Sequence, residues 1–279
     1  MSKELKLCAG AWGFREREIS EYLDACRRLG FRFAEMNLTD SPGAKHLPPK
    51  PSRSQLAAMA RAEEAAGVKV VCLCPGNDFT ASDPDELRAS IADAKANVDV
   101  AADCGAQVVR VFGGWAPFGA LSDGTYQRCA GALAETGEYA QEKGVLVALE
   151  NHGGIAATGA QVRRLLELAD HPNVKANYDG GNFAKDREDP LSAYLVLRDR
   201  VGYTHWKDVR IEERELAYCA LGDGITNWAP VVAALLQDAY DGYWTMEYEE
   251  PSDVEEGMKK CAREILRLSG GSGTSLTGS

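Results

Sequence analysis

Ten residues near the middle of the chain predict its architecture: Val145-Leu146-Val147-Ala148-Leu149-Glu150-Asn151-His152-Gly153-Gly154. The apolar run follows a Lys143-Gly144 break and leads directly into a glutamate. This pattern is typical of a buried parallel strand that delivers polar groups at its carboxyl end. Three later apolar runs end in the same way, at Asp179, at His205 and at Glu247. The sequence therefore predicts four strand ends that supply three carboxylates and one imidazole.

Strand-like runs alternate with helical segments along most of the chain. The predicted strands are residues 6–12, 31–37, 68–74, 106–112, 145–150, 174–179, 202–207 and 243–247. The predicted helices are residues 19–29, 55–66, 83–104, 125–143, 158–169, 190–201, 227–239 and 253–268. Eight strand–helix units predict an α/β fold, the (β/α)8 TIM barrel with a closed parallel sheet. The alternative, an open doubly wound sheet, usually carries a glycine-rich phosphate loop after its first strand, and Gly10-Ala11-Trp12-Gly13-Phe14 lacks that spacing.

One domain is expected over residues 1–268, because no linker-like segment divides them and a chain of 279 residues is ordinary for a single barrel. Residues 269–279 are rich in glycine and serine, and we expect them to form a flexible tail.

The composition disfavours several classes of protein. The net charge of −11, from 31 Lys and Arg against 42 Asp and Glu, argues against a sequence-independent grip on nucleic acid. No apolar run reaches the roughly 18 residues of a transmembrane helix, and the amino-terminal residues lack the apolar core of a signal peptide. The eight cysteines show no CxxC spacing and lie mostly in apolar segments. We therefore expect a cytoplasmic protein with reduced thiols and with neither nucleic-acid nor membrane partners.

Side chains at the carboxyl ends of barrel strands converge on one mouth, where TIM barrels place their chemistry. Residues two apart in a strand point to the same face. The pairs that share a face are Glu150 with His152, Asn177 with Asp179, His205 with Lys207, and Glu247 with Glu249. The spacing leaves open which member of each pair is a metal ligand and which reaches a substrate.

Three carboxylates and one imidazole form a mixed oxygen and nitrogen donor set. Such a set suits one divalent metal ion, Mn²⁺ or Mg²⁺ first and Co²⁺ or Zn²⁺ second, with positions left open for substrate oxygens. The alternative is that these residues are ordinary solvated loop acids. Four such positions on the four consecutive strands of the second half make that interpretation the weaker one.

Four motifs resemble the xylose-isomerase-like barrel superfamily, the group labelled sugar phosphate isomerases/epimerases. They are Leu149-Glu150-Asn151-His152, Asp179-Gly180-Gly181-Asn182, His205-Trp206-Lys207-Asp208 and Gly242-Tyr243-Trp244-Thr245-Met246-Glu247-Tyr248. The resemblance extends over the chain to about Leu268. It implies that Glu150, Asp179, His205 and Glu247 bind one divalent metal ion. It also implies that Glu150 and Glu247 carry protons, as the corresponding glutamates do in ketose epimerases.

Further polar and aromatic residues are candidates for contact with a substrate. His152 is a candidate general base, or a hydrogen-bond partner of a substrate hydroxyl. Lys207 either holds an oxyanion or phosphate or forms a structural ion pair, and Asn182 either binds substrate or satisfies the backbone of its turn. Trp12 and Trp115 follow strand ends and are expected to wall a sugar-sized pocket.

Three more charged or titratable residues are expected to play no direct part in the reaction. Arg110 is expected to form an ion pair with a carboxylate of the barrel. His46 and His171 fall in loops and are expected at the surface.

Two reactions remain open for a small, sugar-like substrate, and the sequence leaves room for a homo-oligomer. The first is isomerisation or epimerisation of a ketose or sugar phosphate, in which a glutamate abstracts a proton beside a metal-chelated carbonyl to give an enediolate. The second is a lyase reaction in which the enediolate expels water or an aglycone, as in keto-cyclitol and dehydroshikimate dehydratases and C-glycoside-cleaving enzymes. A nuclease of this superfamily needs more histidines than the four present, and a non-catalytic binding barrel does not need the full ligand set.

Overall fold

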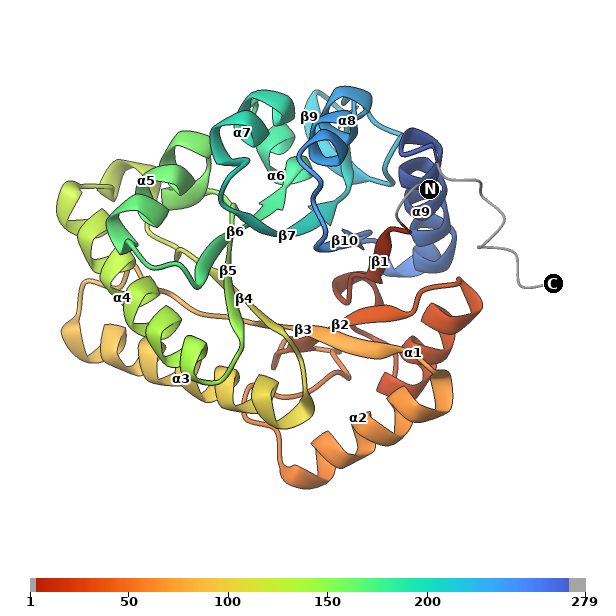
Figure 1. Cartoon of the computed structure of the whole chain (residues 1–279), viewed down its shortest axis with the longest axis horizontal. Helices are drawn as coiled ribbons and strands as arrows, with labels where there is room; N and C mark the ends of the chain where they lie inside the picture. Colours follow the sequence, from red (N-terminus) through yellow and green to blue (C-terminus); the bar gives the residue numbers. More distant parts are fainter. Residues whose placement is uncertain (1–3, 271–279) are drawn as a thin grey trace.

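The computed structural model describes residues 4–270, and its centre is a closed barrel of eight parallel strands (Figure 1). The strands are β1 (Lys6–Ala9), β2 (Phe33–Leu38), β3 (Lys69–Pro75), β4 (Val108–Phe112), β5 (Leu146–Glu150), β6 (Val174–Asp179), β7 (Val201–Trp206) and β10 (Tyr243–Met246). They follow one another around the ring in chain order, and β1 closes it by pairing with β10. The predicted (β/α)8 TIM barrel is confirmed.

Helices cover the outer face of the barrel (Figure 1). They are α1 (Ile19–Arg28), α2 (Arg53–Ala66), α3 (Pro84–Cys104), α4 (Asp123–Glu142), α5 (Gly159–Ala169), α6 (Gly180–Lys185), α7 (Pro190–Leu197), α8 (Ala229–Gln237) and α9 (Val254–Leu268). The start of α3 shows the expected capping, because Asp83 accepts backbone hydrogen bonds from Asp85 and Glu86 ahead of Pro84. Among residues 4–270, none of the helices combines the length and the apolar character that crossing a bilayer requires. The predicted tail lies almost wholly outside the described residues.

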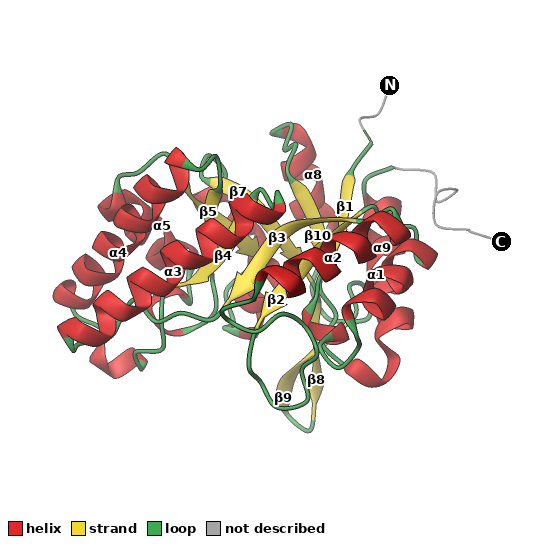
Figure 2. Cartoon of the chain, turned by 90° about the horizontal axis from the view of Figure 1, so that it is seen from below, coloured by secondary structure: helices red, strands yellow, loops and turns green. Residues whose placement is uncertain are grey.

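Two elements were not predicted from the sequence. One is the short helix α6 directly after β6. The other is an antiparallel hairpin of β8 (Asp208–Glu212) and β9 (Glu215–Cys219), which projects from one end of the barrel beyond β7 (Figure 2). Its turn residues Glu213 and Arg214 have positive φ angles of 46° and 77°. Such a turn usually selects Asn or Gly, so this stretch carries none of the usual turn signal.

Aromatic side chains fill the amino-terminal end of the barrel interior. The ring of Tyr243 lies 5.1 Å from that of Phe33 and 6.1 Å from that of Tyr203, measured between centroids. Cysteine, carboxylate and other polar side chains of the same strands follow toward the carboxyl ends. This aromatic packing occupies the amino end, and the pocket described below lies at the mouth formed by the strand carboxyl ends, as is usual for this fold.

Candidate active site

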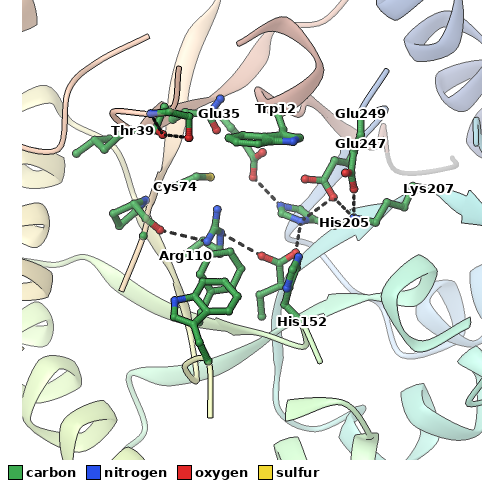
Figure 3. Close-up of a pocket in the computed structure, with 18 residues that line it drawn as sticks. Trp12, Glu35, Thr39, Cys74, Arg110, His152, His205, Lys207, Glu247 and Glu249 are labelled. Carbon is green, nitrogen blue, oxygen red and sulfur yellow. Dashed lines mark hydrogen bonds and ion pairs between the residues drawn. The ribbon is translucent and has the colours of Figure 1, made fainter. Parts of the chain in front are cut away.

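Four strand ends place carboxylate and imidazole groups close together. Ligand atoms of Glu150, Asp179, His205 and Glu247 all lie within 4.8 Å of one another. Nδ1 of His205 faces the three carboxylates, at 3.1 Å from Oε1 of Glu150, 3.4 Å from Oε2 of Glu247 and 3.9 Å from Oδ2 of Asp179. Figure 3 shows His205 and Glu247 side by side in the pocket. The structure therefore brings together all four residues that the sequence suggests as metal ligands, and we name them the carboxylate–imidazole cluster.

The two carboxylate oxygens of Asp179 have different surroundings. Asp179 ends β6 and caps α6, and its Oδ1 accepts a hydrogen bond of 2.9 Å from the backbone N–H of Asn182. The side chain of Asn151, which follows β5, exchanges two hydrogen bonds of 2.8 Å with the backbone of Asp179. Oδ2 is buried, faces the cluster, and receives no well-aligned hydrogen bond from any residue in the range 4–270. The local fold thus fixes Asp179 and leaves one oxygen available for a ligand.

The other nitrogen of His205 has a carboxylate partner of its own. Nε2 lies 2.8 Å from Oε1 of Glu35 on β2, and both side chains are buried (Figure 3). Burial alone lowers the pKa of His205, but the charges of Glu35, Glu247 and Glu150 outweigh it and raise that pKa well above its usual value. A carboxylate behind the imidazole fixes the tautomer whose Nδ1 can bind a metal ion. Glu35 has no sequence signal, because it lies within a strand rather than after one.

Lys207 is a buried cation beside the cluster. Its Nζ lies 2.7 Å from Oε2 of Glu247, 2.6 Å from Oε1 of Glu249 and 3.1 Å from Oδ2 of Asp179. Burial lowers the pKa of Lys207, but these three carboxylates raise it well above its usual value. The backbone makes room for this side chain at Gly181, where a Cβ would lie 2.4 Å from Cγ of Lys207. Lys207 therefore forms ion pairs, which is one of the two alternatives left open by the sequence, and it also lines the pocket, which leaves the contact with an oxyanion or phosphate open.

Both glutamates of the cluster are held as anions. Nε of Arg110, on β4, lies 3.1 Å from Oε2 of Glu150, as expected for an arginine that pairs with a barrel carboxylate. Burial raises the pKa of Glu150, but His205 and Arg110 together lower it to about 2. Burial likewise raises the pKa of Glu247, but Lys207 and His205 lower it well below its usual value. The neighbouring cations thus favour the charged form of both glutamates.

The mouth of the barrel contains a cavity of about 340 Å³, whose walls include Glu150, His205 and Glu247 of the cluster, together with Lys207. This volume lies at the lower end of the range for small-molecule sites, roughly 300–1,000 Å³. The predicted residues Trp12, Trp115 and His152 all line it. The His152 ring packs edge-on against Phe112 and Trp115, with centroids at 5.0 and 5.8 Å. Trp115 is 53% exposed, so its ring is accessible to a bound molecule.

Asn182 lies behind the pocket rather than in its lining. Its amide nitrogen donates to the backbone oxygen of Asn151 at 2.9 Å and lies 3.4 Å from Oε1 of Glu150. Its amide oxygen accepts a hydrogen bond of 2.7 Å from the hydroxyl of Tyr218 on β9. This geometry favours a role for Asn182 in positioning Glu150 over direct contact with substrate. The ring centroid of Tyr218 also lies 4.4 Å from Nζ of Lys207. Tyr218 was not predicted as a site residue because the hairpin that carries it was not predicted.

His46 was expected at the surface, and this expectation is wrong. The loop after β2 folds back so that Leu47 forms a bridge with Leu38, and His46 is only 7% exposed. Its ring stacks on Tyr22 at 5.1 Å, and its Nδ1 lies 3.2 Å from the amide nitrogen of Asn37, a pocket residue. His46 thus supports the wall of the pocket from behind.

The charges around the cluster fit a divalent cation. The cluster and its immediate neighbours contain five carboxylates and two fixed cations. When all five carboxylates are ionised and the imidazole is neutral, the site therefore carries three excess negative charges. The carboxylates are Glu35, Glu150, Asp179, Glu247 and Glu249, and the cations are Arg110 and Lys207. Burial raises the pKa of Asp179 to about 7, although Lys207 opposes the shift. A divalent ion bound by the four residues would add a ligand bond at Oδ2 of Asp179, beside its ion pair with Lys207, and offset most of the excess charge.

The carboxylate–imidazole cluster lies at the carboxyl ends of the strands, which is where TIM-barrel enzymes have their active sites. The fold and the cluster together define a class of TIM barrels with a candidate metal site at this position. Within that class, the chain belongs to the xylose isomerase-like TIM barrel family, whose sequence profile matches residues 23–266.

Known proteins similar to this chain are enzymes of more than one reaction type. An inosose dehydratase of Lacticaseibacillus casei is 28% identical over 146 residues, which are 47% of this chain and 49% of that protein. The chain thus spans about half the length of the curated relatives it matches. A D-allulose 3-epimerase from Methylomonas sp. has a TM-score of 0.77 at 20% identity, over 95% of this chain and 98% of that one.

A xylose isomerase-like TIM barrel protein from Mycobacterium smegmatis, solved in complex with magnesium, has a TM-score of 0.78 at 17% identity over 98% of both chains. At these identities the two solved structures show the fold alone. The proteins that this chain resembles thus include a dehydratase by sequence and an epimerase by fold.

Proposed function

We propose that the protein is a divalent-metal-dependent lyase that removes a proton next to the carbonyl of a small sugar-like ketone and then eliminates water. The observation that carries this proposal is the difference between the proton carriers of the pocket. Glu150 and Glu247 are paired with the cations Arg110 and Lys207, whereas the His152 ring packs against Phe112 and Trp115 and interacts electrostatically with Asp186. Imidazole is the side chain that most readily both accepts and donates a proton near neutral pH.

The oxygen-rich donor set suits Mn²⁺ or Mg²⁺. A divalent ion held by the cluster would polarise the substrate carbonyl and acidify the neighbouring C–H bond. The protein residues supply the remaining parts of the reaction. His152 takes the proton from carbon, and Lys207 contributes a fixed positive charge close to the developing oxyanion. The C–H electrons form a double bond conjugated with the carbonyl, the C–O bond of the β-hydroxyl breaks, and His152 returns its proton to the departing hydroxyl as water.

The sequence relatives agree with this choice of reaction, since the inosose dehydratase named above acts, by its name, on a keto-cyclitol. The eight free thiols fit a reducing compartment, so we assign the activity to the cytoplasm.

The second candidate is the isomerase or epimerase reaction expected first from the sequence. One observation favours it: two carboxylates, Glu150 and Glu247, face the same His205 nitrogen at 3.1 and 3.4 Å. If binding of the metal ion releases either glutamate from its cation, the pair could move a proton between two carbons or two faces of one carbon. The epimerases among the structural neighbours share the fold needed for this reaction.

The experiment that separates the two reactions is incubation with keto-cyclitols and ketoses in deuterated water, followed by NMR. The proposal predicts loss of water and an unsaturated product from at least one keto-cyclitol. It also predicts a fall in turnover of roughly 10²–10⁴-fold for His152→Gln, as for the loss of a general acid/base. Deuterium incorporation with the carbon skeleton and all hydroxyls retained, at an undiminished rate in His152→Gln, would contradict the lyase and support the epimerase.

A further inference from the structure

Behind His205, on the side away from the cluster, lies a second group of potential ligands. It consists of Glu35 on β2 with Cys72 and Cys74 on β3, and one ligand atom of each lies within 4.8 Å of the others. All three side chains are buried. Glu35 is directly paired with Cys72 in the sheet, and Cys72 and Cys74 are two residues apart, so all three point into the barrel.

The spacing of the two sulfur atoms is close to that of a metal-bound pair. Sγ of Cys72 lies 4.0 Å from Sγ of Cys74. Two thiolates bound to one tetrahedral Zn²⁺ at about 2.3 Å would lie about 3.8 Å apart. Little movement is therefore needed for both sulfur atoms to bind one ion. A carboxylate has two oxygens with several lone pairs, so Glu35 can accept from Nε2 of His205 through Oε1 and still offer a ligand atom.

We propose that Glu35, Cys72 and Cys74 form a second metal site, selective for a thiophilic divalent ion such as Zn²⁺ or Cd²⁺. Thiolate ligands select such ions, whereas the oxygen-rich cluster suits harder ones. Glu35 and Cys74 also line the pocket, and Figure 3 shows the Cys74 sulfur directed toward its interior. The pocket thus gives an ion access to the site and leaves a coordination position open to solvent or substrate.

The charge balance of the second site is favourable. When the ion displaces the two thiol protons to solvent, two thiolates and one carboxylate face two positive charges. Arg110 lines the same wall, but its guanidinium is already paired with Glu150. An ion in this site would hold Glu35 in place behind His205, and would thereby stabilise the imidazole tautomer that the first site needs.

The experiment uses the full chain, stripped with a chelator and titrated with Cd²⁺. The thiolate-to-cadmium charge-transfer absorption reports sulfur ligation independently of activity. Wild type is expected to bind two Cd²⁺ ions per chain and to develop this absorption. Cys72→Ser/Cys74→Ser is expected to bind one Cd²⁺ ion and to show no charge-transfer absorption. Asp179→Asn, which is altered only in the first site, is expected to keep the absorption.

A matched control is Cys26→Ser/Cys129→Ser, which removes two buried thiols elsewhere and should leave the absorption unchanged. Circular dichroism of each stripped variant checks folding, and Cys74→Ala replaces the double variant if that protein does not fold. The proposal is overturned if wild type shows no thiolate absorption. It is equally overturned if the absorption survives loss of Cys72 and Cys74, or disappears in the control.

Discussion

The two halves of the barrel mouth differ in chemistry. The cluster residues lie at the carboxyl ends of strands β5, β6, β7 and β10. The buried cation Lys207 directly follows β7 and pairs with Glu247. The mouth beside β1 and β4 presents the aromatic rings of Trp12, Phe112 and Trp115. Under the function proposed above, the charged half would hold the ion and the reacting atoms, and the aromatic half would contact the body of the substrate. Variants in the two halves should therefore have separable effects on metal binding, turnover and KM.

The largest effect is expected at Glu247, in the charged half. Glu247→Gln keeps the size of the side chain but removes a ligand charge, which lies 3.4 Å from Nδ1 of His205 and 2.7 Å from Nζ of Lys207. We expect weakened metal binding and a fall in turnover of at least roughly 10²-fold, since an interaction with the reacting centre is lost. Metal content and steady-state kinetics of the purified variant measure both effects.

Glu249→Gln is the matched control, because Glu249 also contacts Nζ of Lys207, at 2.6 Å, but does not belong to the cluster. It should retain the metal ion and alter mainly the affinity for substrate. Loss of the metal ion from Glu249→Gln alone would mean that the ligand on this strand end has been assigned to the wrong residue.

A smaller effect is expected at Glu35. This residue lies on β2, outside the charged half, but its side chain contacts His205 of the cluster. Glu35→Gln removes the carboxylate that accepts from Nε2 of His205. Loss of such a partner typically weakens metal binding by roughly 10–100-fold. Isothermal titration with Mn²⁺ measures the change.

Glu63→Gln alters another buried glutamate, one that accepts a hydrogen bond from the backbone of Val70. As a control it should affect stability without affecting Mn²⁺ affinity. Equal Mn²⁺ affinities for Glu35→Gln and wild type would show that Glu35 is not a partner of the metal ligand.

The smallest effect is expected at Trp115 in the aromatic half. Stacking on an aromatic ring contributes about 0.5–1.5 kcal/mol, so Trp115→Ala should raise KM by about 2–10-fold with little change in kcat. Steady-state kinetics on the preferred substrate provide the test, with the exposed helical residue Leu195→Ala as a control for surface truncation. A fall in kcat with unchanged KM would place Trp115 in the chemistry and remove the distinction between the two halves.

The sequence predicted the site residues that come at or just after the ends of barrel strands, including Trp12 and Trp115, but missed Glu35 and Tyr218, for a physical reason. Glu150, Asp179, His205 and Glu247 each follow an apolar strand, so chain position alone places them at the mouth. Glu35 lies inside a strand and acquires its role from a histidine 170 residues away in the chain. Such long-range partners leave no local pattern.

Loop conformation limited the prediction in the same way. The hairpin that supplies Tyr218 turns at two residues with positive φ that are neither Asn nor Gly. His46 is buried because its loop returns to β2, which depends on the pairing of Leu38 with Leu47. The barrel itself was predictable because each of its strand–helix units carries a local hydrophobic pattern.

If the cluster binds one hard divalent ion, isothermal titration of the stripped protein with Mn²⁺ at several pH values will show it. We expect one ion per chain. Because the carboxylates raise the pKa of His205 and burial raises that of Asp179 to about 7, protons must leave on binding, so affinity should increase as the pH rises from about 5 through 7. Asp179→Asn should bind much more weakly. The account is contradicted if wild type binds no Mn²⁺ at any of these pH values, or if Asp179→Asn binds it as tightly as wild type.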